Sequence, residues 1–358
     1  MTAVKNITSS VHNYTISFEA SVDFLKDLIN DPAAIYIVDE QVFHIYKAQL
    51  SDLQHSKRLI LLKAVEENKT LAAAEHVYDK IIELKPTKKT KIVSIGGGIT
   101  QDVSGFVAST FYRGLKWIYV PTTLLAQADS CMGSKTSLNY KSYKNILGTF
   151  YPPHEIYISA AFTATLKEED YYSGLGEVAK LHTMGGQKTL DYLFSILPGI
   201  HGRDEAVITA ATKSSLDIKW TYMEHDEFDQ GIRNMLNFGH EYGHAIETAT
   251  NYTIPHGQAV IIGMIMANDV AVRKGQLSAA LNERLNTMYF SMLKCDYKQL
   301  AITDTNLVIG AMKQDKKRAG TGLPLIMMNN DFVFSKITDL TEAEATETLT
   351  YFQNTYCR

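Results

Sequence analysis

The sequence predicts a two-domain protein of the α/β class: an N-terminal domain with a Rossmann-like parallel sheet, followed by a mostly α-helical C-terminal domain. Three observations support this prediction. At 358 residues the chain exceeds the usual size of one hydrophobic core. Short β-branched runs alternate with helical patterns in the first half, and the strand signals fade in the second half. We expect the domains to span residues 1–167 and 168–358.

The first half carries the order strand, helix, strand that a parallel sheet with crossover helices requires. Strands are predicted over residues 34–40, 58–62, 90–98 and 115–123, with an amphipathic helix over 70–84. The second half has helical spacing over 169–184, 206–225 and 259–275. Only 323–328 and 332–337 read as late strands.

The composition indicates a globular protein whose partners are small molecules. It is 45% hydrophobic and 21% charged with a net charge of -4, which argues against nucleic-acid binding. No apolar run approaches the roughly 20 residues that span a bilayer, so we expect no membrane partner. The three cysteines form no CxxC pair or disulfide framework, which fits a reducing cytoplasm.

A run of three glycines, Gly96–Gly98, follows directly on a predicted strand. Backbone without side chains can approach a pyrophosphate there and offer its N–H groups. The run is not the GxGxxG fingerprint, because Gln101 stands where the third glycine should be. A tight turn between strand and helix is the alternative. Asp102 is expected to cap the next helix or to contact a cofactor.

The stretch from residue 120 to 153 reads as loop-rich and follows another strand. Loops at the carboxyl ends of parallel strands are where such sheets bind ligands. Its lysines and its asparagine are donors that suit a phosphate group. The alternative is solvated lysines on a surface loop. The residues of interest in this stretch are Thr122, Thr123, Asp129, Lys135, Lys144 and Asn145.

The segment 237–256 is rich in histidine and has two interpretations. His240, Glu241 and His244 match HExxH, in which two histidines one helical turn apart hold zinc and the glutamate is a general base. The extended protease motif would need a histidine where Thr250 stands. This argues against a metalloprotease.

The second interpretation takes His240 and His256 as ligands, with a carboxylate from elsewhere as the third. Three protein ligands with an open position are typical of a catalytic zinc site. Glu177 is the candidate, because Lys180 three residues later shares its helix face. The flanking glycines 239 and 243 would let the histidine helix approach a ligand closely. Core histidines and a surface Glu–Lys pair remain the alternative.

The motif series of the chain resembles that of 3-dehydroquinate synthase, within the sugar phosphate cyclase superfamily. It comprises GGGITQD, RGLKWIYVPTTLLAQADS, SKT, YKNILGTFYPP, SGLGEVAK, DQGIRNMLNFGHEYGHAIE, HGQAV and QDKKRAG. The resemblance implies NAD, zinc or cobalt, and a seven-carbon keto-acid phosphate substrate. In that chemistry NAD oxidises a hydroxyl, phosphate leaves, the carbonyl is reduced again, and the ring opens and closes by aldol addition.

The resemblance also implies roles for individual residues. Metal ligands would be Glu177, His240 and His256. Catalytic and substrate-binding residues would be Asp129, Lys135, Lys180, Lys219, Arg233, Asn237 and His244. Substrate phosphate would be held by Arg113, Asn145, Lys316 and Lys317. NAD would contact Asp39, Glu66, Lys69, Gly97, Gly98, Asp102, Thr122, Thr123, Lys144, Phe162 and Thr165. The resemblance also implies a homodimer and a role for Arg113 across the subunit boundary.

Arg233 favours an acidic substrate, because a guanidinium can pair with a carboxylate through two hydrogen bonds. An internal ion pair is the alternative. Ser134 and Ser137 replace glycines usual in the family, and Gln258 replaces a glutamate. These departures leave room for an amino analogue or a neutral sugar phosphate. A metal-dependent polyol dehydrogenase and a catalytically silent binding protein are further alternatives.

Overall fold

The computed structural model describes residues 3–141, 143–316 and 322–357. The chain divides into two compact units, and each is described by itself. Unit 1 runs to Leu166 and includes Arg203–Ala210, while unit 2 holds Lys167–Gly202 and the chain from Ala211. The short segment 203–210 thus joins unit 1 after the chain has entered unit 2, which a single boundary in the sequence does not capture.

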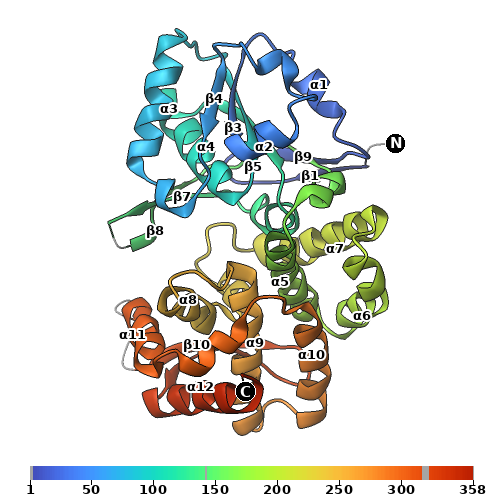
Figure 1. Ribbon diagram of the computed structural model, residues 1–358, viewed down its shortest axis with the longest axis vertical. Coiled ribbons are helices and arrows are strands. Elements are labelled where there is room, and N and C mark those ends of the chain that lie inside the picture. Colours follow the sequence, from blue (N-terminus) through green and yellow to red (C-terminus); the bar gives the residue numbers. More distant parts are fainter. Residues whose placement is uncertain (1–2, 142, 317–321, 358) are drawn as a thin grey trace. The chain divides into compact units, whose positions relative to one another are not determined.

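Unit 1 is built on one seven-stranded sheet (Figure 1). Neighbouring strands are parallel except for the antiparallel pair at one edge, so the predicted parallel sheet is confirmed. The strands lie in the order β1 (Ala3–Ile7), β2 (Tyr14–Phe18), β9 (Glu155–Ile158), β6 (Lys116–Pro121), β5 (Lys91–Gly96), β3 (Ala34–Asp39) and β4 (Leu59–Leu62).

Helices cover both faces of this sheet, which explains why its strands read as continuous apolar runs. Alternate β3 residues Tyr36 and Val38 belong to a core cluster with Leu25 and Phe43. These two partners come from α1 (Phe24–Leu28) and α2 (Glu40–Ile45). The opposite face is covered by α4 (Gly98–Thr110), which contacts β3, β5 and β6 and packs against α3 (Leu71–Glu83).

The stretch 120–153 differs from its prediction as a loop-rich region. It contains a helical turn, η4 (Ala126–Ser130), and a hairpin of β7 (Lys135–Tyr140) and β8 (Tyr143–Phe150). Thr136 and Leu138 of β7 are buried, whereas β8 is largely exposed. Thr136 and Leu138 are thus the only inward positions of β7, so the alternation of buried and exposed residues is short. Among so many polar residues, a pattern of this length does not distinguish a strand from a loop.

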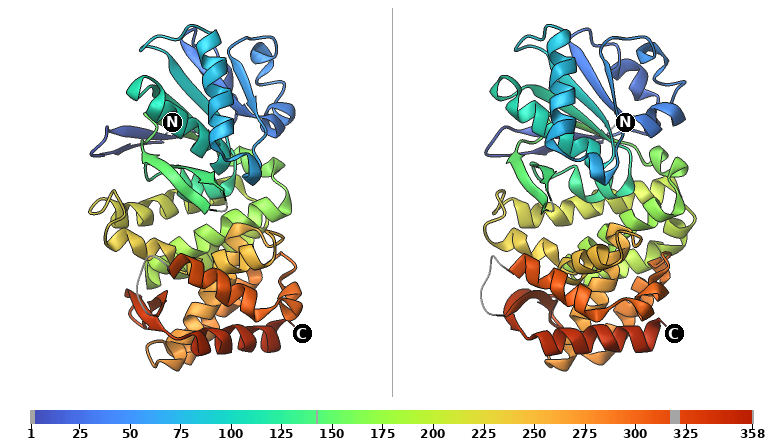
Figure 2. Two further views of the ribbon diagram at one scale, coloured as in Figure 1. Left: turned by 90° about the vertical axis from the view of Figure 1, so that its left-hand side faces the viewer. Right: turned by 60° about the vertical axis from the view of Figure 1, so that its left-hand side comes forward.

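Unit 2 is mostly helical, as predicted (Figure 2), and is organised around α9 (His256–Arg273). This helix is buried from Gly257 to Asn268 and contacts α5, α8, α10 and α12. The other helices are α5 (Glu168–Met184), α6 (Gln187–His201), α7 (Glu205–Met223, which begins in unit 1), α8 (His240–Ala249), α10 (Ala279–Met292), α11 (Thr305–Lys316) and α12 (Glu342–Tyr356). Both late strands are confirmed as the antiparallel pair β10 (Leu323–Met328) and β11 (Phe334–Leu340).

Short helical turns complete the chain: η1 (Ser51–Leu53), η2 (Glu66–Asn68), η3 (Phe111–Arg113), η5 (Ala160–Thr165), η6 (Ile232–Asn237) and η7 (Tyr297–Ile302). Several of them carry predicted site residues. Within the described residues, no helix has the length and apolar character needed to cross a membrane.

Candidate functional site

The glycine run of unit 1 forms the turn from β5 into α4. A Cβ atom on Gly96 would lie 2.4 Å from Thr100 Oγ1, and one on Gly97 would lie 3.0 Å from Thr123 Cγ2. Gly97 is the N-cap of α4 and contributes no capping side chain. The first turn of a 13-residue helix therefore presents its backbone N–H groups beside side-chain-free backbone, an arrangement that suits an anion.

Asp102 does not cap α4, because the helix begins four residues earlier. Its carboxylate instead lies 2.5 Å from Lys69 Nζ and accepts a hydrogen bond of 2.8 Å from the N–H of Ser137. Burial raises the pKa of Asp102, and the ammonium of Lys69 opposes this shift. Asp102 thus ties α4 to Lys69 at the end of η2 and to the β7–β8 hairpin, which are contacts between residues far apart in the chain.

Further predicted residues join this network. Lys69 Nζ donates to Asn145 Oδ1 at 2.6 Å. The Glu66 carboxylate accepts from Asn139 Nδ2 at 2.8 Å and lies 3.7 Å from Lys144 Nζ. The structure therefore brings four predicted cofactor residues and the predicted phosphate residue Asn145 into one polar cluster.

The remaining predicted residues of unit 1 have varied surroundings. Asp39 is the N-cap of α2, and burial raises the pKa of its carboxyl. Thr165 shares a hydrogen bond of 2.9 Å with the Tyr46 hydroxyl. The Phe162 ring is part of the core, so its side chain stabilises the fold, and its contact with a cofactor stays a prediction. Thr122 is buried, Thr123 and Asp129 are half-buried, and Arg113 and Lys135 are exposed.

In unit 2, three predicted metal ligands from three helices converge. Glu177 lies in the middle of α5, while His240 and His256 are the first residues of α8 and α9. Glu177 Oε1 lies 3.2 Å from His256 Nε2 and 3.6 Å from His240 Nε2. Helix starts and a helix centre thus place one carboxylate oxygen and two imidazole nitrogens together.

His244 lies one helical turn after His240 and also belongs to this cluster. One ring nitrogen from each of His240, His244 and His256 lies within 4.8 Å of the other two. His244 is exposed, whereas the side chain of Glu177 is only 2% exposed. The geometry therefore brings together four side chains that could bind a metal. Two sets of three are candidates for the ligands: Glu177 with His240 and His256, or the three histidines.

The charges at this site are strongly coupled. Lys180 Nζ lies 2.5 Å from Glu177 Oε2, and both side chains are buried. Burial, reinforced by Lys180, holds the pKa of His240 well below its usual range. Burial also opposes protonation of His256, but Glu247 and Glu177 more than offset it and raise its pKa to about 10.

Two glycines allow α5 and α9 to approach closely enough for Glu177 to meet His256. A Cβ atom on Gly176 would lie 2.1 Å from the carbonyl oxygen of Gly257, and one on Gly257 would lie 1.8 Å from that of Ser173. The Ser173 hydroxyl accepts a hydrogen bond from the Gly257 N–H at 3.0 Å. Backbone therefore packs on backbone beside the candidate ligands.

Gly239, the N-cap of α8, and Gly243 within α8 both pack against α9. Gly239 has φ +79°, and its Cβ would lie 2.6 Å from Met264 Cγ. A Cβ on Gly243 would lie 3.2 Å from the Ala259 carbonyl oxygen. Both glycines thus face α9 and allow the tight α8–α9 crossing, while the expectation that they bring α8 near a ligand stays a prediction.

Gly257→Ala is expected to destabilise the protein by roughly 1–3 kcal/mol, the usual cost of overpacking, because backbone atoms block the added methyl group. Metal affinity should fall as well, since α5 and α9 must separate. Urea unfolding and a metal titration measure the two effects. Gly310→Ala in α11 is the control: nothing lies within 4 Å of its Cβ position, so stability should stay the same or rise. Equal stability of the two variants would contradict this packing argument.

Glu247 is a residue of the site that sequence reasoning missed. It is buried near the end of α8, and its Oε2 lies 3.1 Å from His256 Nδ1. A carboxylate only accepts hydrogen bonds, so Nδ1 carries the proton and donates it. The sequence spacing could have indicated this residue. Glu247 follows His240 by seven residues, or two helical turns, which places both side chains on the same face of the helix.

Besides Lys180 and His244, three predicted substrate residues of unit 2 lie in α7 and η6. Lys219 and Arg233 are both buried, and Asn237 is exposed. The Arg233 guanidinium donates to the carbonyl oxygen of Glu227. The side chain of Lys316 and the whole of Lys317 lie outside the described residues.

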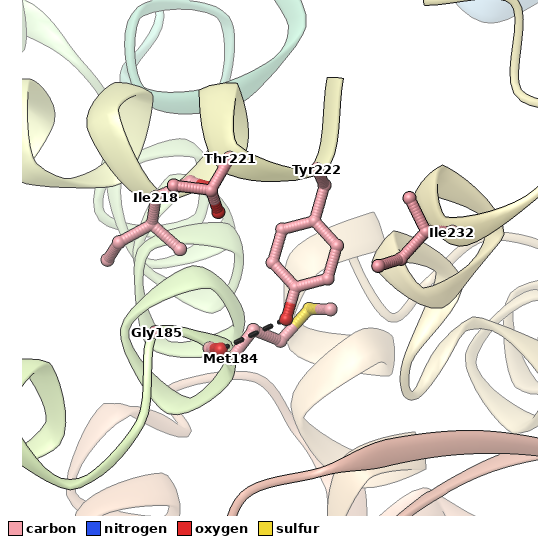
Figure 3. A pocket seen from close by; sticks show the side chains of 6 residues that line it. All are labelled: Met184, Gly185, Ile218, Thr221, Tyr222 and Ile232. Carbon is pink, nitrogen blue, oxygen red and sulfur yellow. Dashed lines mark hydrogen bonds between the residues drawn. The ribbon is translucent and has the colours of Figure 1, made fainter. Parts of the chain in front are cut away.

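A separate hollow of about 280 Å³ opens at the carboxyl end of α5 (Figure 3). The hydroxyl of Tyr222 donates to the Met184 carbonyl oxygen across it at 3.1 Å. Its lining has no charged side chain to neutralise a phosphate or a carboxylate, so the hollow does not suit an anionic substrate. It is lined by Met184, Gly185, Ile218, Thr221, Tyr222 and Ile232.

Comparison with known proteins identifies the relatives of this chain. Residues 59–173 match the model of the 3-dehydroquinate synthase N-terminal region, and residues 174–318 match that of the C-terminal region. The 3-dehydroquinate synthase of Clostridium tetani is 34% identical over 86% of this chain and 84% of its own length. The chain belongs to the 3-dehydroquinate synthase family. The 3-dehydroquinate synthase of Sulfurovum sp. NBC37-1 is 32% identical over 96% of this chain and 97% of its own length.

A solved structure shares the fold of this 3-dehydroquinate synthase family member. It is the 2-epi-5-epi-valiolone synthase ValA from Streptomyces hygroscopicus subsp. jinggangensis 5008, with NAD⁺ and Zn²⁺ bound. The TM-score is 0.82 at 20% identity, and the match covers 99% of both chains. The expected fold class is thereby confirmed for both halves of the chain.

The departures from the usual 3-dehydroquinate synthase motifs have local explanations. Ser134 has φ +65°, a conformation that favours the glycine usual there. The Ser137 hydroxyl donates to Asn145 Oδ1 at 3.0 Å, a bond that glycine could not make.

The third departure, Gln258, is a packing residue rather than a partner of His256. Its amide nitrogen donates to the carbonyl oxygens of Tyr172 and Met292, and its oxygen accepts from the N–H groups of Lys294 and Cys295. A glutamate carboxylate could not donate to those two carbonyls. Glutamine thus satisfies four backbone groups from two segments, Tyr172 of α5 and the stretch 292–295.

Proposed function

We propose that the chain cyclises 3-deoxy-arabino-heptulosonate 7-phosphate to 3-dehydroquinate with elimination of phosphate, using NAD and a divalent metal. The observation that carries this proposal is the cluster of the buried pair Glu177 and Lys180 with the half-buried His240 and His256, in a member of the 3-dehydroquinate synthase family. This cluster joins a candidate metal site to an ammonium that can act on the substrate.

The donor set fits a zinc or cobalt ion held by Glu177, His240 and His256. Donors about 2.1 Å from a tetrahedral centre lie roughly 3.4 Å apart. The separations of 3.2 and 3.6 Å from Glu177 Oε1 to the two Nε2 atoms bracket this value. His240 Nδ1 lies 3.2 Å from the Phe238 carbonyl and His256 Nδ1 faces Glu247, so both rings direct Nε2 toward the carboxylate. The ion would polarise the hydroxyl that loses hydride.

NAD would accept a hydride and return it within each turnover, so the cofactor itself would be regenerated. In the proposal Gly97 and Gly98 present backbone N–H groups to its pyrophosphate. The cluster of Glu66, Lys69, Asp102 and Lys144 then lines the same site. Asp39, Thr122, Thr123, Phe162 and Thr165 complete the proposed set.

The substrate would be bound through its two acidic groups. Lys219 and Arg233 are buried cations, and a guanidinium suits a carboxylate better than a neutral hydroxymethyl group. Arg113, Asn145, Lys316 and Lys317 are proposed to bind the phosphate. Asp129, Lys135, Lys180, Asn237 and His244 would contact the rest of the molecule.

The proposal extends to the shikimate pathway, a cytoplasmic location and a homodimer. The pathway and the homodimer rest on the family likeness, and the location rests on the cysteines. None of the three cysteines forms a disulfide, which fits a reducing compartment.

The decisive experiment incubates the protein with the heptulosonate phosphate, NAD and Zn²⁺ or Co²⁺, and measures phosphate release together with the carbocyclic product. One phosphate per product, with no net NADH, is expected. A parallel reaction with sedoheptulose 7-phosphate tests a neutral substrate. Accumulating NADH would instead indicate a dehydrogenase, and turnover of the neutral sugar alone would overturn the proposed substrate.

Arg233→Ala is expected to lower kcat/KM for the heptulosonate phosphate by about tenfold or more, because a charged hydrogen bond contributes roughly 1.5–3 kcal/mol. Steady-state kinetics of phosphate release measure the effect. The exposed Arg284 of α10 provides a control, and Arg284→Ala should leave kcat/KM unchanged. If Arg233→Ala had the same kcat/KM as wild type, a neutral substrate would be indicated.

A further inference from the structure

The loop that precedes η6 is fastened by one carboxylate. Asp226 accepts hydrogen bonds from the backbone N–H groups of Gln230 at 2.8 Å, Gly231 at 2.7 Å and Arg233 at 3.0 Å. These three N–H groups span four residues of chain. One side chain therefore fixes the path of the backbone into Arg233. We refer to residues 226–234 as the Asp226 loop.

Two more contacts close the Asp226 loop on itself. The Asn234 amide donates to the carbonyl and carboxylate oxygens of Asp229, both at 3.1 Å. The Arg233 guanidinium donates to the Glu227 carbonyl oxygen, within the same loop. Asp229 has φ +58°, a conformation that costs energy for a residue other than glycine. Surrounding hydrogen bonds must hold such a residue in place.

The fastened backbone separates two neighbouring side chains. Ile232 is 54% exposed and lines the apolar hollow at the carboxyl end of α5 (Figure 3). Arg233, the next residue, is only 4% exposed. A rotation of this backbone would move the guanidinium out of its buried position.

We infer that Asp226 is a positioning residue for Arg233, holding the guanidinium ready for the carboxylate of the substrate. This inference rests on the proposed function. A preorganised donor loses less freedom when the substrate binds, so the loop would improve binding of an acidic substrate and contribute little to a neutral one. Hydrogen bonds from the three backbone groups also lower the pKa of Asp226, so its carboxylate stays ionised at neutral pH.

The first test measures the fastening in the protein without substrate. Amide hydrogen exchange of residues 230–233 is followed in wild type, Asp226→Ala, Asp226→Asn and the control Glu224→Gln. Faster exchange is expected in Asp226→Ala, with a smaller increase in Asp226→Asn, because asparagine keeps one acceptor oxygen. Glu224 is exposed and its carboxylate faces His225, so Glu224→Gln should exchange like wild type. Unchanged exchange in Asp226→Ala would overturn the inference.

The second test separates binding from chemistry. Asp226→Ala is expected to raise KM for the heptulosonate phosphate by about tenfold with kcat within about twofold of wild type, as for a lost binding contact. Asp226→Asn should restore part of the loss. Affinity for sedoheptulose 7-phosphate, measured by calorimetry, should stay unchanged.

The outcomes distinguish the inference from the function on which it rests. A wild-type protein that releases no phosphate from the heptulosonate phosphate would overturn the proposed function. An active wild type whose Asp226→Ala variant keeps its KM would overturn only the role of Asp226. Equal losses of affinity for the acidic and the neutral compound would overturn it too, because they would indicate a general structural defect.

Discussion

Glu177→Gln is expected to remove the bound metal and abolish turnover while the fold persists. An amide oxygen is a much poorer zinc ligand than a carboxylate, and the two histidines alone hold the ion weakly. Glutamine keeps the volume of the side chain and an acceptor for Lys180, which lies 2.5 Å away. Metal content of the purified protein, far-ultraviolet circular dichroism and phosphate release measure the three parts of this expectation.

Alanine at position 177 is a less informative change. Removing one partner of a buried ion pair costs roughly 3–5 kcal/mol, because the other charge is left buried without compensation. Glu177→Ala would leave the Lys180 ammonium buried without its partner and destabilise the fold. Loss of metal could then not be distinguished from loss of the fold. Glu168→Gln, at the exposed start of α5, is the matched control and should retain metal and activity.

The same experiment decides between the two possible ligand sets. If Glu177, His240 and His256 bind the ion, His244→Ala should keep its metal and lose activity. If the three histidines bind it, His244→Ala should lose metal and Glu177→Gln should retain it. Full activity of a metal-free protein would contradict both sets.

Much of the fold follows from local patterns in the sequence. The β-branched runs of β3 and β5 and the amphipathic α3 are each specified within a single segment. The pairing of Glu177 with Lys180 is also local, because the residues are three positions apart on one helix. Predictions of this kind need only the period of the backbone.

Contacts between distant segments could not be predicted in this way. Asp102 was expected at a helix start, yet it bridges to Lys69 and to the β7–β8 hairpin. The glycines beside His240 have a packing role that becomes visible only when α9 lies against α8. Glycine marks a close approach in a sequence, but the approaching group is set by the tertiary fold.

Glu247→Ala is expected to weaken metal binding by about 10–100-fold, the usual cost of losing a group that orients a ligand histidine. Glu247 Oε2 lies 3.1 Å from His256 Nδ1 and thereby fixes the tautomer that directs Nε2 toward Glu177. Without this carboxylate the ring can rotate and the other tautomer becomes accessible. Competition with a zinc chelator of known affinity measures the change in the dissociation constant.

Substitutions within α8 distinguish the role of Glu247 in orienting His256 from the effect of its negative charge. Glu247→Gln keeps an oxygen that can accept from Nδ1, so its loss of affinity should be smaller than that of Glu247→Ala. Glu241→Gln removes a charge from the same helix at the position that a zincin would use as its base, and it should leave affinity and turnover unchanged. If Glu241→Gln abolished turnover while Glu247→Ala bound zinc normally, the HExxH interpretation would regain support, and the assignment of His256 as a ligand oriented by Glu247 would fail.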